Sequence, residues 1–214
     1  FQALAVCAVR PIERILVVNR SKQRAEQLCQ ALATQGLSTE LRIADSAQAA
    51  LRNADIVCCA TSAPTPIFDD ADIRPGTHIN GVGSFTPHMA EVPVATIARA
   101  HVIVDQLEAA WAESGDLLNA QAAGVIDQRR TTELGAVIAG QAPARRPDVD
   151  CLRDDPPRSC DRARLPQLYL LRGRRHGAQR DVDPAGGLPA LAQGPAPAPG
   201  QHVPLLLHDA LQRR

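Results

Sequence analysis

Residues 1–146 are predicted to form an α/β domain built on a doubly wound parallel sheet. Short, continuous apolar runs recur along this part of the chain, and such runs are typical of parallel strands that are covered on both faces. Segments with helical spacing separate the runs. Because parallel strands must be joined by crossover connections, this alternation indicates parallel pairing with helices on both faces of the sheet.

The amino-terminal elements are expected to be a helix, a strand and a second helix. The apolar stretch 1–9 is followed by an Arg-Pro pair and predicts the tail of a buried helix. Residues 13–19 hold a continuous apolar run and predict a buried strand. Ser21 can cap the next helix, in which apolar residues share one face, and Gly36 can end it.

The same alternation continues as far as residue 105, after which the pattern becomes helical. Further strands are expected at 38–44, 55–60, 77–82 and 101–105. Further helices are expected from a cap at Asp45 or Ser46 through Leu51, and at 93–98, 107–113 and 132–139, where Gly140 closes the last one.

Residues 147–214 differ in composition from the rest of the chain. Residues 1–146 contain eleven Ile, nine Thr and seven Glu, whereas residues 147–214 contain none of these and hold ten Arg and ten Pro. The Pro-Ala-Pro-Ala-Pro run at 195–199 can continue neither a helix nor a central strand. We therefore expect a low-complexity Arg/Pro-rich tail that is disordered or non-native. A shifted reading frame in a GC-rich gene is one hypothesis for its origin, which resequencing the codons for 146–151 would test.

The composition argues against several classes of function. The formal net charge is +0, whereas general nucleic-acid and membrane-surface proteins need an excess of basic groups. The six Cys show no metal-ligand spacing, so we expect reduced, buried thiols and no metal site. Because no apolar run of about 18 residues and no signal-peptide pattern occurs, we expect a cytoplasmic protein. Phe1 is not an initiator and Met89 is the only Met, which indicates a fragment.

Three turns that follow predicted strands carry the candidate chemistry, because a doubly wound sheet binds ligands at the carboxyl ends of its strands. The first is Asn19-Arg20-Ser21, which lacks the acidic residue that would hold an adenosine ribose. Asn19 could hold one ribose hydroxyl, Arg20 could pair with a 2′-phosphate, and Ser21 could add a donor at a helix N-terminus. This favours NADP(H). The alternative is a surface turn in which Ser21 only caps a helix and Arg20 is solvated.

The second and third turns could complete a dinucleotide site. Residues 60–64 are small or hydroxylated and would let a ribose and a pyrophosphate approach the backbone, although such turns are also common loops. Residues 80–87 contain Gly81 and Gly83, which permit close packing, and should lie where a nicotinamide ring meets its substrate. The structural alternative is a turn in which Thr86 and Pro87 open a short helix through Glu91.

Taken in order, these segments resemble the ornithine cyclodeaminase and mu-crystallin family. The resemblance extends over most of residues 1–146 without a gap. The segments that carry it are Arg10-Pro11-Ile12, Asn19-Arg20-Ser21 with Ala25-Glu26, Ala54-Asp55-Ile56-Val57, residues 60–64, residues 75–84, Val104-Asp105, residues 113–118, Glu133-Leu134-Gly135 and Gly140.

The resemblance implies a Rossmann-type domain with a nicotinamide cofactor, NADP(H) being favoured and NAD(H) possible, in a parent protein that forms a homodimer. Asn19, Arg20, Ser21 and Arg24 would surround the adenosine 2′-phosphate. Ala60, Thr61 and Ser62 would line the middle of the cofactor, Val82 would lie near the nicotinamide, and Ser84 would face the substrate.

The chain departs from the family pattern at Phe85, where ornithine cyclodeaminases have an aspartate that assists chemistry at the substrate amine. Without that carboxylate, ammonia-eliminating cyclisation loses its candidate base. The resemblance therefore implies hydride transfer to the C=N bond of a small imino acid, as in ketimine and Δ1-pyrroline-2-carboxylate reductases, or amino-acid dehydrogenation of the alanine type.

The family's first strand and glycine-rich loop would precede Phe1, as would the Arg and Lys that bind the substrate. We therefore expect a sheet that lacks its first strand and glycine loop, we assign no catalytic residue, and we expect the 214-residue chain alone to be inactive. The alternatives to an imino-acid reductase are an NAD-dependent ornithine cyclodeaminase, a non-catalytic binding protein like mu-crystallin, and an inactive fragment.

Overall fold

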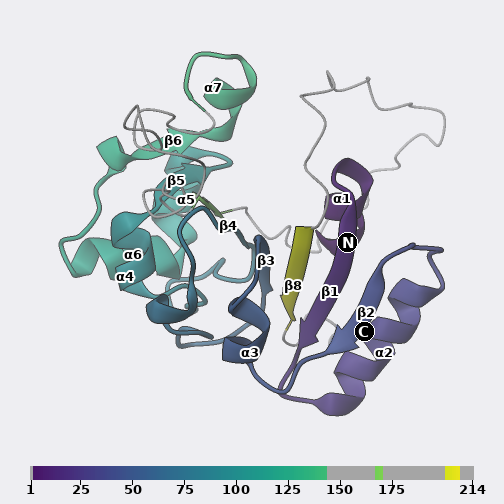
Figure 1. The fold of residues 1–214 in the computed structure, drawn as a ribbon. Coiled ribbons are helices and arrows are strands. Elements are labelled where there is room, and N and C mark those ends of the chain that lie inside the picture. Colours follow the sequence, from purple (N-terminus) through teal and green to yellow (C-terminus); the bar gives the residue numbers. More distant parts are fainter. Residues whose placement is uncertain (1, 144–166, 171–200, 208–214) are drawn as a thin grey trace, which may run out of the picture.

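The computed structural model describes residues 2–143, 167–170 and 201–207. They form an eight-stranded sheet with the strand order β2-β1-β8-β3-β4-β7-β5-β6 (Figure 1). All neighbouring strands pair in parallel, which confirms the predicted parallel sheet. The strands are β1 (Ile12–Val18), β2 (Glu40–Ile43), β3 (Ile56–Ala60), β4 (His78–Gly81), β5 (His101–Val104), β6 (Thr131–Glu133), β7 (Gln167–Leu170) and β8 (Gln201–Leu207).

The helices cover both faces of this sheet, as expected for a doubly wound domain. They are α1 (Gln2–Val9), α2 (Lys22–Ala33), α3 (Ala47–Leu51), α4 (Val94–Arg99), α5 (Leu107–Glu113), α6 (Gly115–Ala122) and α7 (Leu134–Ile138), with single 3-10 turns η1 (Asp70–Asp72) and η2 (Gln128–Arg130). Ser21 caps α2 and Ser46, rather than Asp45, caps α3. Gly36 follows α2 with a φ of 69°, a left-handed backbone that favours glycine and suits a helix stop.

Two details of the expected secondary structure were wrong. Residues 131–133 form strand β6 instead of the start of a helix, so α7 begins at Leu134. Helix α6 was not expected, although Ser114 caps it by accepting a hydrogen bond from the Leu117 N–H at 3.5 Å. The alternative considered for the turn after β4, a short helix from Thr86 through Glu91, is not formed, and the chain makes a turn there.

Two apolar clusters, one on each face, hold the helices against the sheet. The alternation of side chains along a strand divides β3 between them: Ile56 and Cys58 join the cluster under α1 and α2, whereas Val57 and Cys59 join the cluster under α3 to α6. A strand covered on both faces in this way reads as a continuous apolar run, which is why β3 was visible in the sequence. Because β3 is held rigidly, the turn that follows it has a fixed starting point.

Beyond residue 146 no strand was expected, yet the structure places two in the sheet. β8 lies between β1 and β3, the central position that the first strand of a Rossmann-type sheet would take, and β7 lies between β4 and β5. Without a strand between them, β1 and β3 would each leave a row of unpaired backbone groups, which explains why a Pro-containing segment is accommodated there. The rest of 147–214, including the run at 195–199, lies outside the described residues, so the division at residue 146 and the disorder of the tail stay predictions.

The cysteines in the described part of the chain are Cys7, Cys29, Cys58 and Cys59, and all four are free thiols. Burial raises the pKa of Cys58 to about 11 and that of Cys59 well above its ordinary value, so both stay protonated at neutral pH. In the described ranges no group of three or more His, Cys, Asp or Glu is arranged to hold a metal ion. Nor does any helix there combine the length and apolarity needed to cross a bilayer.

Candidate functional site

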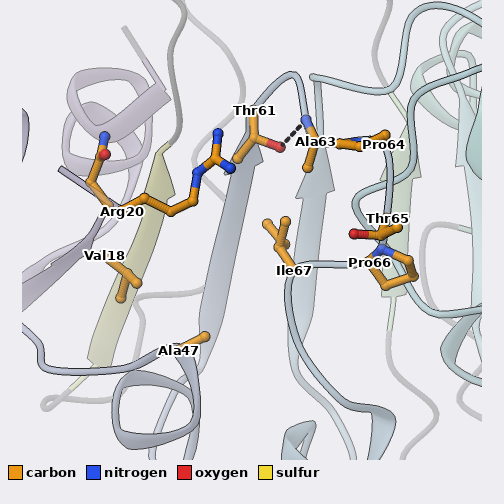
Figure 2. A pocket seen from close by; sticks show the side chains of 10 residues that line it. Val18, Arg20, Ala47, Thr61, Ala63, Pro64, Thr65, Pro66 and Ile67 are labelled. Carbon is orange, nitrogen blue, oxygen red and sulfur yellow. Dashed lines mark hydrogen bonds between the residues drawn. The ribbon is translucent and has the colours of Figure 1, made fainter.

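A cavity of about 290 Å³ opens at the carboxyl ends of β1 and β3 (Figure 2). Its walls come from the end of β1, the start of α3 and the segment that follows β3. The lining residues are Val18, Asn19, Arg20, Ala47, Thr61, Ala63, Pro64, Thr65, Pro66 and Ile67. The structure thus brings Asn19 and Arg20, from the first predicted turn, and Thr61, from the second, to one cavity.

The turn after β1 is shaped by its own side chains. The Ser21 N–H donates to Asn19 Oδ1 at 2.9 Å, and the Arg24 N–H donates to Ser21 Oγ at 3.4 Å. Ser21 therefore caps a helix, as in the alternative interpretation of this turn, and it does not line the cavity. Arg20 is exposed, and Figure 2 shows its guanidinium directed across the cavity toward Thr61. Arg24 lies in the first turn of α2, outside the lining.

The segment after β3 forms the opposite wall. Thr61 is buried and its Oγ1 accepts a hydrogen bond from the Ala63 N–H at 3.2 Å, which folds the chain back on itself. Residues 63–67 then run along the cavity. Ala60 and Ser62, which flank Thr61, are not among the lining residues, and the Ser62 side chain is exposed.

The turn after β4 lies beside this wall but does not line the cavity. The Val82 N–H donates to the Cys59 carbonyl at 2.9 Å, so Val82 continues the pairing of β3 with β4. Ser84 is buried, and its hydroxyl donates to the Met89 carbonyl at 3.0 Å and accepts from the Asp116 N–H at 2.9 Å. The hydroxyl of Ser84 is therefore hydrogen-bonded within the protein. Ser84 does not line the cavity, so its contact with a substrate stays a prediction.

Sequence reasoning missed a buried carboxylate, Glu91, that joins the turns after β3 and β4. Its side chain is 0% exposed. Oε1 accepts a hydrogen bond from the Thr61 N–H, and Oε2 accepts one from the Gly83 N–H at 2.7 Å. Burial raises the pKa of Glu91, while the hydrogen bonds from Thr61 and Gly83 oppose this rise. A carboxylate can bridge these two amides because it accepts on both oxygens.

Asp116, on α6, is a second buried carboxylate and supports the first. Its Oδ1 accepts hydrogen bonds from the N–H groups of Glu91 at 2.8 Å and Val92 at 3.1 Å. Among the described residues, Oδ2 has no hydrogen-bond partner. Burial raises the pKa of Asp116 to about 7, and the nearby Glu91 carboxylate adds to the rise. In the sequence both acids stand among small and apolar residues, and Asp116 lies in the segment 113–118 that contributes to the family resemblance.

A family model matches most of this chain, including the segments that carried the resemblance described above. The model of the ornithine cyclodeaminase/mu-crystallin family matches residues 1–152. The chain belongs to this family. The resemblance inferred from the turns after β1, β3 and β4 is therefore confirmed.

Two relatives show what this chain is similar to. A Delta(1)-pyrroline-2-carboxylate reductase of Bacillus cereus is 36% identical over 150 residues, which are 69% of this chain and 46% of that protein. Ketimine reductase mu-crystallin of Mus musculus is 36% identical over 126 residues, which are 59% of this chain and 37% of that protein.

A solved structure of this family shares the fold. It is the Delta(1)-pyrroline-2-carboxylate reductase of Thermococcus litoralis in complex with NADH and L-proline, which matches with a TM-score of 0.67 and 31% identity. The match covers 80% of this chain and 49% of that chain. The chain therefore spans less than half the length of each of these three relatives.

Proposed function

We propose that residues 1–146 form the cofactor-binding domain of an enzyme that transfers hydride between NADP(H) and a small imino acid, of the ketimine or Δ1-pyrroline-2-carboxylate reductase type. The observation that carries this proposal is the cavity at the ends of β1 and β3, with Arg20 on one wall and Thr61 on the other. Doubly wound sheets bind dinucleotides at this edge. The names of the bacterial, archaeal and mouse relatives support the imino-acid chemistry.

Arg20 supports NADP(H) as the preferred cofactor. A guanidinium can form paired, charge-assisted hydrogen bonds with a 2′-phosphate. None of the ten residues that line the cavity is Asp or Glu, so no carboxylate in the lining would repel that phosphate. In this proposal Asn19 holds the neighbouring ribose hydroxyl, and the start of α2, with Ser21 and Arg24, adds a positive helix terminus. NADH, which is bound in the Thermococcus structure, is the cofactor to compare.

Reduction fits the residues after β4 better than ornithine cyclisation does. Phe85 stands where the family's cyclodeaminases have an aspartate, and it has no group that could take a proton from a substrate amine. Hydride transfer needs less from the protein, since the cofactor makes the bond and the site orients the two reactants. We also propose that the whole protein is cytoplasmic and forms a homodimer.

Titration of the 214-residue chain with NADPH and NADH tests the cofactor site. We expect Arg20→Ala to weaken NADPH binding about tenfold, which corresponds to loss of a charge-assisted pair, and to leave NADH binding unchanged. Arg129→Ala removes an exposed Arg from η2, outside the cavity lining, and serves as the matched control. Equal losses for NADPH and NADH would contradict the pairing of Arg20 with a 2′-phosphate, and binding of neither by the wild-type chain would overturn the proposed function.

The reaction itself is tested on the whole protein by following NADPH consumption in the presence of Δ1-pyrroline-2-carboxylate. A reductase consumes NADPH in proportion to the imine that is reduced. A purely binding protein would bind NADPH and consume none.

A further inference from the structure

One wall of the cavity, the segment after β3, is bonded to a segment that does not itself line the cavity. Residues 89–92 pass behind the wall formed by residues 61–67 and bond to it at three points. The Ala90 N–H donates to the Ala63 carbonyl at 2.8 Å, and the Ile67 N–H donates to the Glu91 carbonyl at 3.0 Å. The third point is the Glu91 side chain, whose Oε1 accepts from the Thr61 N–H.

The same carboxylate also reaches the turn after β4. Its Oε2 accepts from the Gly83 N–H at 2.7 Å, so one side chain ties Thr61 to Gly83. The two turns pack so closely there that a Cβ on Gly83 would clash with the Thr61 backbone and with Glu91 Oε1. Close approach of the backbones, and not a left-handed φ, is what requires glycine at this position.

Glu91 is itself held in place from α6. Asp116 accepts hydrogen bonds from the Glu91 and Val92 N–H groups, and the Asp116 N–H bonds to Ser84, which is in the turn after β4. Each described bond in this network lies in the interior, where an unpaired amide or carboxylate costs more than in water. The network therefore links the turns after β3 and β4 to α6 through buried hydrogen bonds.

We propose that Glu91 is a positioning residue for the cofactor: its carboxylate holds the turns after β3 and β4 at the spacing that the middle and the nicotinamide half of a dinucleotide require. This inference rests on the proposed function. Glu91 acts through Thr61, which lines the cavity, and through Gly83, and it does not line the cavity itself. The turn after β1, which would hold the adenosine half, is shaped by bonds within itself, since the Ser21 N–H donates to Asn19 and the Arg24 N–H donates to Ser21.

The different bonding of these turns gives a test with two ligands. NADPH needs all three turns, whereas 2′,5′-ADP, which carries only the adenosine half with its 2′-phosphate, needs the turn after β1. In Glu91→Gln one amide oxygen remains as an acceptor, while the new NH2 group faces the other backbone N–H. We expect the Kd for NADPH to rise about tenfold, as for one lost charge-assisted hydrogen bond, and the Kd for 2′,5′-ADP to stay within about twofold.

The control variant is Glu108→Gln, which makes the same chemical change at an exposed position on α5 and should alter neither Kd. Amide hydrogen exchange supplies a readout that needs no cofactor. In Glu91→Gln, we expect faster exchange in peptides that cover residues 61–67 and 82–84, with unchanged exchange in residues 12–33. Arg20→Ala should show the opposite ligand pattern, because it weakens 2′,5′-ADP and NADPH together.

Each other outcome has a definite meaning. If Glu91→Gln weakens NADPH and 2′,5′-ADP by the same factor, its role is general stability and the positioning role is overturned. Unchanged binding of both ligands overturns it as well. If the wild-type chain binds neither ligand, the proposed function fails, and the exchange experiment alone then decides whether Glu91 spaces the two turns.

Discussion

The turns after β1 and β3 face each other across one cavity, but they are held in different ways. The turn after β1 holds itself, through hydrogen bonds that link residues two and three positions apart in the chain. The turn after β3 is held by Glu91, which is 30 positions away from Thr61, and Glu91 is held in turn by Asp116, a further 25 positions along. One turn is a local structure and the other depends on the tertiary fold.

Because they are held differently, the two walls should differ in how well they tolerate substitution. A self-contained, exposed turn can exchange side chains such as Arg20 without disturbing the sheet, because surface substitutions have small effects on stability. In the proposed function, this turn would select between phosphorylated and unphosphorylated cofactors. A wall held by buried carboxylates tolerates little change, since a lost partner leaves a buried polar group unpaired. That wall determines the shape of the cavity.

The largest expected effect breaks the tertiary wall. Gly83→Ala places a methyl group against the Thr61 backbone and Glu91, neither of which can move away freely, so we expect a loss of about 3 kcal/mol or more in the free energy of unfolding. Urea denaturation followed by circular dichroism measures it. Gly135→Ala, in α7 with nothing within 4 Å of the added Cβ, should be neutral or stabilise by up to about 1 kcal/mol. A Gly83→Ala chain as stable as Gly135→Ala would contradict the close packing of the two turns.

The second effect concerns pH and Asp116. Burial raises the pKa of Asp116 from its ordinary value of 3.8 to about 7, so between these values the folded state binds more protons than the unfolded state. Stability should therefore fall as pH rises across this window, by a few kcal/mol in total. Glu91 and Cys59 lie close enough to couple to Asp116, and the raised pKa of Glu91 acts in the same direction.

Asp116→Asn keeps an oxygen for the Glu91 and Val92 amides but cannot ionise. We expect the free energy of unfolding, measured by urea titration at about pH 4 to 8, to vary less with pH in this variant than in the wild-type chain. Asp127→Asn, at the exposed cap of η2, should leave the slope as it is. If the free energy of unfolding varied with pH equally in Asp116→Asn and the wild type, the pKa of Asp116 would be the same in the folded and unfolded states, which would contradict the raised pKa.

The same contrast explains which features could be predicted. The strands β1, β3 and β5 were expected within one residue of their observed ends, because strands buried on both faces have continuous apolar runs. The Ser21 cap was also predicted, since both partners lie within four residues. In contrast, Glu91 has the appearance of an ordinary loop acid until the fold brings Thr61 and Gly83 to it.

β8 was missed for a related reason. Its place between β1 and β3 depends on the pairing of strands that are far apart in the sequence, and no local pattern of residues predicts such a pairing. The Pro-rich composition around it argued against a central strand, and local preference lost to the need to pair two open edges. Arg20 and Thr61 could be assigned to one site because topology brings the carboxyl ends of parallel strands together. The buried carboxylates behind that edge, Glu91 and Asp116, are brought into place only by tertiary packing, so the sequence pattern did not reveal them.

The smallest expected effect sharpens the contrast from the local side. Ser21→Ala removes the cap of α2, which leaves the Arg24 N–H without its side-chain acceptor, and should cost about 1 kcal/mol of unfolding free energy. Ser62→Ala, an exposed serine beside Thr61, should change it by less than about 0.5 kcal/mol. Because the cap is local, hydrogen exchange should quicken in residues 21–25 and stay unchanged in residues 61–67. Faster exchange in both segments would show that the turn after β1 is coupled to the wall opposite, and the division of the site into a selecting turn and a shaping wall would then be wrong.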